Sequence, residues 1–151
     1  MTLLRRSSRA LLLAGAILGA AAVAGAALAC SCLPPGSAAA QMEGADLVIV
    51  ARVAEVRRLP STSAGPMAET RFTVARTLKG EARENWWIRH QRGDSAMCGV
   101  DFSPGDEYVV IAHRTEAGLV TGLCSRAWFP REDYERAAAE AEAGAEAEAS
   151  G

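Results

Sequence analysis

The chain of 151 residues is long enough for one ordinary domain and too short for two of usual size. Half of its residues are hydrophobic and 23% are charged, a composition that excludes a wholly disordered or collagen-like chain. The formal net charge of −2, with no run of lysine or arginine, gives no reason to expect a nucleic-acid partner.

Residues 1–29 have the three parts of a secretory signal peptide. Three arginines form a positive start, and an apolar stretch rich in alanine and leucine follows. Residues 27–29, Ala-Leu-Ala, form the small-x-small pattern that signal peptidase cleaves. We therefore expect a secreted, extracellular protein, or a periplasmic one, that begins at Cys30. A retained membrane anchor is the alternative, since an apolar stretch of roughly 20 residues can span a bilayer.

Residues 27–30, Ala-Leu-Ala-Cys, also match loosely a bacterial lipobox, in which the new N-terminal cysteine carries a lipid. The usual leucine three residues before the cysteine is Ala27 here. A lipid on Cys30 would also leave three cysteines, an odd number for an exported protein. Membrane attachment is therefore expected only if Cys30 is lipidated, which would make the protein envelope-anchored.

The middle of the chain, residues 30–130, predicts a small all-β domain in which 11 basic and 11 acidic side chains balance. Ser37 is expected to cap a short helix over residues 38–42, which Gly44 ends. A loop rich in serine and glycine covers residues 60–66. The expected strands, in chain order, cover residues 46–56, 70–78, 86–90, 98–102, 107–112 and 118–124.

Alternation within the strands predicts two shared faces, one with Phe72, Val74 and Leu78 and one with Trp86, Ile88 and His90. Short antiparallel strands after one long first strand are typical of a small closed barrel of five to six strands. Closure removes the exposed edges that such strands otherwise leave. An immunoglobulin-like sandwich is the alternative, but that fold usually packs a tryptophan between paired cysteines.

Four cysteines, Cys30, Cys32, Cys98 and Cys124, predict two disulfides in an exported domain. A bond between the first two would close a very tight ring, so each should reach across to one of the later two. Each bond would close a loop of many tens of residues, for which the chain-entropy model gives roughly 4 kcal/mol. Such bonds have two possible roles. They either stabilise a small domain, or they hold the start of the chain rigid because it is part of a functional site.

No arrangement of residues predicts an enzyme. His90 and His113 are single histidines without a carboxylate at ligand spacing, so we expect surface or hydrogen-bonded structural histidines. Oxidised cysteines leave no thiolate for a Cys-His nucleophile, and their spacing is not the Cys-x₂-Cys that zinc sites prefer. Of the adjacent Trp86 and Trp87, one should be in the core and the other on the surface.

Residues 131–151 contain seven acidic and two basic side chains and run into an alanine–glutamate repeat. Only Tyr134 offers an apolar side chain large enough to dock. We therefore expect a solvated, flexible tail that the fold does not need.

Several motifs follow one another in order along residues 30–130. They are Cys-Ser-Cys at 30–32, Ala-Asp-Leu-Val-Ile at 45–49, Ala-Met-Cys-Gly-Val at 96–100, Glu-Tyr at 107–108 and Leu-Cys at 123–124. Together they resemble the inhibitory N-terminal domain of the tissue inhibitors of metalloproteinases. The Cys-x-Cys motif is specific here because it directly follows a cleavage site and has two partner cysteines at matching distances.

The resemblance implies an OB-fold-like Greek-key barrel with short flanking helices and with Cys30–Cys98 and Cys32–Cys124 disulfides. It also implies a secreted inhibitor of zinc metalloendopeptidases that has no cofactor of its own and shares the zinc of its target. The α-amino nitrogen and carbonyl oxygen of Cys30 would chelate that zinc, and Ser31 would enter the specificity pocket. The other implied contacts are Cys32, Leu33 and Pro34 along the cleft, and Ala96, Met97 and Cys98 from the connected loop.

The sequence departs from the family in two places. Glu43 stands where the family has a further cysteine, so a third disulfide is missing. The acidic tail stands where animal members have a six-cysteine C-terminal domain. Two other functions remain open: a non-inhibitory binding module of the cell envelope, with or without a lipid, and a purely structural domain stabilised by disulfides.

Overall fold

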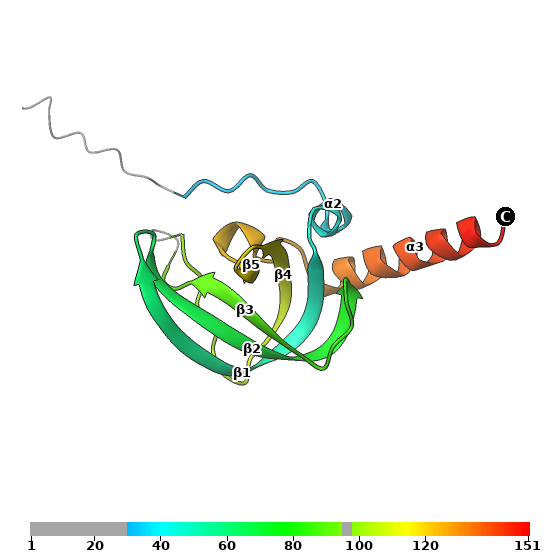
Figure 1. Cartoon of the computed structure of the whole chain (residues 1–151). Helices are drawn as coiled ribbons and strands as arrows, with labels where there is room; N and C mark the ends of the chain where they lie inside the picture. The colour runs from blue at the N-terminus through cyan, green and yellow to red at the C-terminus, as the bar shows by residue number, and fades with distance from the viewer. Residues whose placement is uncertain (1–29, 95–97) are drawn as a thin grey trace, which may run out of the picture.

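Five strands form a single sheet in the computed structural model, which describes residues 30–94 and 98–151 (Figure 1). The elements in chain order are α2 (Ala38–Glu43), β1 (Leu47–Thr62), β2 (Gly65–Lys79), β3 (Asn85–Gln91), β4 (Glu107–Thr115), β5 (Gly118–Thr121), the 3-10 helix η3 (Leu123–Ser125) and α3 (Arg131–Ala149). Ser37 caps α2 as predicted, because its side chain accepts a 3.1 Å hydrogen bond from the Ala40 N–H, and Gly44 ends the helix. The expected signal segment, residues 1–29, lies outside the described residues.

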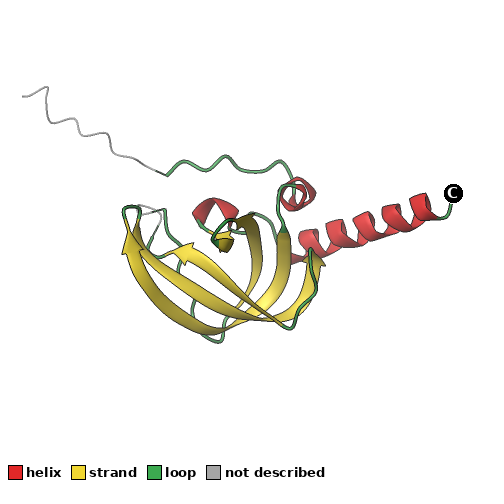
Figure 2. Ribbon diagram, viewed as in Figure 1, coloured by secondary structure: helices red, strands yellow, loops and turns green. Residues whose placement is uncertain are grey.

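The sheet closes on itself, because β4 pairs with β1 and the strand order is β1-β2-β3-β5-β4 (Figure 2). All neighbours are antiparallel except β3 and β5, which run parallel through the pairs Arg89–Val120 and His90–Thr121. Antiparallel pairing throughout, expected from the short strands, was therefore wrong. A closed ring of five strands cannot alternate in direction all the way round, so at least one pair must be parallel.

Residues 98–102, predicted as a short strand, form a loop instead. Cys98 has a left-handed backbone with a φ of 58°, which interrupts an extended run. The Gly99 N–H donates to the Asp94 carbonyl at 3.1 Å and folds the loop back beside β3. A Cβ at position 99 would lie 2.4 Å from the carbonyl carbon of Arg92, so this close approach requires glycine.

The hairpin of β1 and β2 is longer than expected. A loop was predicted over residues 60–66, yet β1 continues to Thr62 and β2 begins at Gly65. Gly65 has a φ of 127°, which a glycine adopts without strain. Beyond Arg52, β1 pairs with β2 alone, so Pro60 lies where no second strand needs its missing N–H.

Apolar side chains form two clusters, one on each side of the closed sheet. The buried residues of the interior cluster are Leu47, Ile49, Ala51, Val53, Phe72, Trp86, Ile88, Val110, Ala112 and Leu119. Those of the outer cluster, between sheet and helices, are Ala38, Met42, Ala45, Val48, Val50, Leu78, Ile111, Tyr134 and Ala138. The first five residues of β1 are buried on both faces because alternate residues enter the two clusters. The predicted common face was wrong for Leu78, because the β1–β2 register shifts beside Val50.

Helix α3 differs from the solvated tail expected from Arg131 onward. Residues 131–149 are helical, and the first two turns bury Tyr134 and Ala138 against α2. The helix then projects away from the sheet (Figure 1). The expectation was wrong for residues 131–138, because alanine favours helix formation strongly and is small enough to let one helix approach another closely. Residues 139–151 are exposed to solvent.

Candidate functional site

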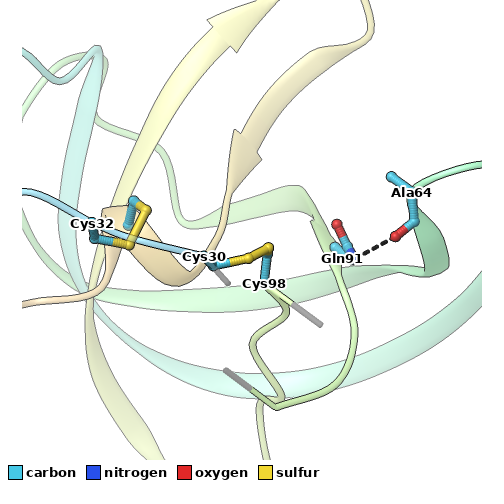
Figure 3. The surroundings of a disulfide bond; sticks show 6 residues. Cys30, Cys32, Ala64, Gln91 and Cys98 are labelled. Atoms are coloured by element: carbon cyan, nitrogen blue, oxygen red, sulfur yellow. Dashed lines mark hydrogen bonds between the residues drawn. A yellow bond between two sulfur atoms is a disulfide. The ribbon is translucent and has the colours of Figure 1, made fainter. Parts of the chain in front are cut away.

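Two disulfides hold residues 30–36, here called the terminal segment, against the closed sheet. Cys30 is bonded to Cys98 and Cys32 to Cys124, so the pairing predicted from the family resemblance is confirmed (Figure 3). The two partner cysteines follow β3 and β5, which lie side by side and run parallel. The loops after these strands therefore leave the closed sheet at the same end, where both strands finish, and the terminal segment crosses that end.

The terminal segment presents an exposed outer side. Ser31 and Pro34 are exposed, and the side chain of Leu33 is 93% exposed. A single exposed leucine is ordinary on a protein surface, but this one belongs to backbone that two covalent bonds hold in place. The structure thus brings together six of the predicted contact residues, Cys30, Ser31, Cys32, Leu33, Pro34 and Cys98. Ala96 and Met97 lie outside the described residues.

A hollow of about 460 Å³ lies beside the terminal segment. It is lined by Cys30, Ser31 and Cys98 and by residues 120–125. A second hollow, of about 320 Å³, shares Thr121 and Gly122 with the first and is also lined by Phe102 and Tyr108. None of residues 120–125 was predicted as a contact residue. They could have been predicted in the same way as the neighbours of Cys98, since they surround the other partner cysteine.

His90 is buried beneath the loop that carries Cys98 and forms hydrogen bonds through both ring nitrogens. Nδ1 donates to the Val100 carbonyl at 2.9 Å, and Nε2 accepts from the Thr70 hydroxyl at 2.8 Å. Burial lowers the pKa of His90 below its usual 6.5, because the imidazolium would lose its hydration; the Gln91 and Val100 carbonyls partly oppose this. His90 is therefore a hydrogen-bonded structural histidine, as predicted.

Side-chain chemistry at the terminal segment is limited. Both disulfides together use all four cysteine sulfurs, so none is a thiol. Within residues 30–94 and 98–151, no three His, Cys, Asp or Glu side chains are grouped to hold a metal ion. At Cys30, whose sulfur is bonded to Cys98, the polar groups that remain are the backbone nitrogen and carbonyl oxygen. None of the helices in this part of the chain is both long and apolar enough to cross a membrane.

No protein-family model matches the sequence, and no curated protein is significantly similar to it. The resemblance to the metalloproteinase inhibitors therefore stays a prediction, and function has to be argued from the geometry of the terminal segment.

Proposed function

We propose that this protein is a secreted inhibitor of zinc metalloendopeptidases that begins at Cys30 and binds the catalytic zinc of its target through that residue. The observation that carries the proposal is an exposed terminal segment held by two disulfides. A chain start is normally the most frayed part of a domain, and this one contributes no strand to the sheet. Such firm attachment is explained if the terminus itself is a binding surface.

We further propose that the closed sheet is an OB-fold Greek-key barrel. Five strands in one closed sheet agree in number with that fold. The position of α2 and α3 on the outside of the sheet, with two disulfides at one end of it, is also consistent with an OB-fold.

The proposed contact with zinc follows from the chemistry of a free chain start. A catalytic zinc ion has three protein ligands and an open position that holds water. Once the chain is cleaved before Cys30, the amine and the carbonyl oxygen of this residue can displace that water as a chelate. Only the neutral amine can donate its electron pair, and an α-amino group has a pKa of about 8. Inhibition should therefore weaken as the pH falls below about 8.

The side chains that follow would set which proteases are bound. The proposed contacts are Ser31 in the specificity pocket, Cys32, Leu33 and Pro34 along the cleft, and Ala96, Met97 and Cys98 beside them. Because the disulfides already order the backbone of residues 30–32, binding costs less conformational entropy than it would for a free terminus.

Adding one alanine before Cys30 tests the proposal. The extension turns the amine into an amide, whose nitrogen is a poor donor, and places bulk where the zinc would lie. We expect it to abolish inhibition of a panel of zinc endopeptidases and to leave thermal unfolding unchanged. A Ser31→Gly variant should instead change the preference among targets, by about 1–2 kcal/mol. Equal inhibition by the extended and native proteins would mean that the terminus is only a structural crosslink.

A non-inhibitory binding module of the cell envelope is the second candidate, favoured by the hollow that Phe102 and Tyr108 line. A lipid thioether on Cys30 would need the sulfur that is bonded to Cys98. The intact mass of the exported protein therefore separates the two candidates. A start at Cys30 with two disulfides and no lipid supports the inhibitor, and a diacylglyceryl adduct contradicts it.

A further inference from the structure

The second half of the terminal segment, residues 33–36, is fixed at its two ends and not between them. Residues 33–36 make no backbone hydrogen bond to any described residue, and two of these four residues are prolines. The Cys32–Cys124 disulfide holds the upstream end, and the downstream end leads directly into α2. The path of residues 33–36 therefore depends on the position of α2.

Helix α2 has six residues, too few to be stable without its neighbours. Its buried residues Ala38 and Met42 pack in the outer cluster. The Lys79 ammonium donates to the carbonyls of Met42 and Glu43 at 2.8 Å each and so fixes the C-terminal end of the helix. A second set of bonds holds the middle of the helix, through the side chain of Gln41.

Tyr134 of α3 joins three parts of the chain at one hydroxyl group. The residue is fully buried, and its hydroxyl donates to Gln41 Oε1. The same oxygen accepts from the N–H groups of Trp128 at 2.9 Å and Phe129 at 3.4 Å. Gln41 Nε2 in turn donates to the Arg126 carbonyl at 2.8 Å. These bonds tie α2 and α3 to the chain that follows η3.

We propose that Tyr134 is a positioning residue for the inhibitory terminus, an inference that rests on the function proposed above. Through Gln41 it sets the place of α2, and α2 sets the path of residues 33–36 toward the target. Both ends of residues 33–36 are then held by one short stretch of chain. Cys124 anchors the upstream end, and the Arg126 carbonyl, two residues later, anchors the downstream end. Helix α3 thus takes part in binding without touching the target.

Two variants separate positioning from general stability. Tyr134→Phe removes the hydroxyl and keeps the ring that packs edge-on against Phe129. Ile88→Val is the matched control, because it loosens the interior cluster and leaves the hydroxyl junction intact. In backbone NMR relaxation of the mature protein, we expect the order parameters of Leu33 and Gly36 to fall below about 0.6 in Y134F. They should stay at the native value in I88V.

Inhibition of the zinc endopeptidase panel gives the second readout. We expect Y134F to dissociate from its target about tenfold faster than the native protein, since three groups lose a buried partner. I88V should dissociate at the native rate even if its melting temperature falls as far as that of Y134F. Gln41→Leu should have the effect of Y134F, and the double variant should add little, because both changes break one junction.

Three results would overturn the proposal. They are native order parameters in Y134F, an equal effect of I88V, and lowered order parameters with an unchanged dissociation rate. Failure of the function itself is distinguishable: the native protein would then inhibit no zinc endopeptidase, whereas the order parameters would still decide whether Tyr134 positions the terminal segment.

Discussion

The two ends of the described chain are held in opposite ways. The terminal segment has no regular secondary structure, yet two covalent bonds fix it. Helix α3 satisfies its own backbone, yet only its first turns are buried and residues 139–151 are exposed. A chain end can therefore have a fixed position even if it lacks secondary structure, as the terminal segment does, or has a repetitive composition, as α3 does. The contacts of a few side chains decide whether it does.

A row of alternating charges accompanies the buried contacts of α3. Arg131 bonds Glu107 of β4 at 2.6 Å and Glu135 of its own helix at 2.8 Å. Glu135 also faces Arg76 of β2 at 3.9 Å, and Glu107 faces Arg52 of β1 at 3.8 Å. These side chains are in part exposed to solvent, so salt screens them and their contribution is small. The buried tyrosine therefore carries most of the attachment of α3.

Removing a disulfide should have the largest effect on stability among the changes considered for the two chain ends. Replacing both cysteines of one bond by serine frees a loop with a sequence separation of 68 or 92 residues. We expect the free energy of unfolding to fall by roughly 4 kcal/mol, measured by urea denaturation. Ser31→Ala, between the two cysteines, is the control and should unfold like the native protein. A loss under about 1 kcal/mol would mean that other contacts order the terminal segment.

Truncation separates the two parts of α3. A chain that ends at Ala141 keeps Tyr134 and should unfold within about 0.5 kcal/mol of the full chain. A chain that ends at Pro130 loses the buried ring and leaves a gap beside Gln41, so it should lose about 3 kcal/mol or more. This outcome would reverse the sequence-based expectation that the tail is dispensable. Equal unfolding of the two shortened chains would restore that expectation.

The smallest effect concerns pH and the loop that anchors Cys30. Because burial lowers the pKa of His90 below 6.5, the unfolded chain binds this proton more readily than the folded protein does. Stability should be complete above pH 6.5 and be lost as the pH falls from there toward the folded pKa. Thermal unfolding at about pH 5 and about pH 7.5 measures this loss.

A His90→Gln variant is the control for that measurement, because glutamine does not titrate. Its melting temperature should fall less between the two pH values than that of the native protein. Glu55 and Glu81 act at lower pH, since hydrogen bonds from Arg57 and Arg83 lower the pKa of these carboxyls below 4.5. An undiminished fall in H90Q would assign the pH dependence to groups other than His90.

Features that depend on neighbours along the chain were predictable from the sequence. The Ser37 cap and the turn before Gly118 are of this kind. So is the contrast between buried Trp86 and partly exposed Trp87, over which Arg57 stacks at 3.8 Å. The loop at residues 98–102 was not predictable, because its form depends on close packing against the end of β3.

Some features of the candidate site were likewise predictable from the sequence, and others were not. The disulfide pairing was predictable because the cysteines stand in a series of motifs that resembles a known family. The role of Tyr134 left no such signal. Its side-chain partner, Gln41, lies 93 residues away, and its other partners are backbone N–H groups, which every sequence has. Only the folded chain shows that they meet.

The two long-range disulfides also impose an order of events on the export proposed above. The chain emerges from its N-terminus, so Cys30 and Cys32 appear first and wait for partners 68 and 92 residues behind them. During that interval they are neighbouring thiols, and an oxidant that acted early would find only these two to join. The terminal segment is therefore synthesised well before the cysteines that secure it, and correct pairing depends on oxidation slow enough, or disulfide exchange fast enough, to await them.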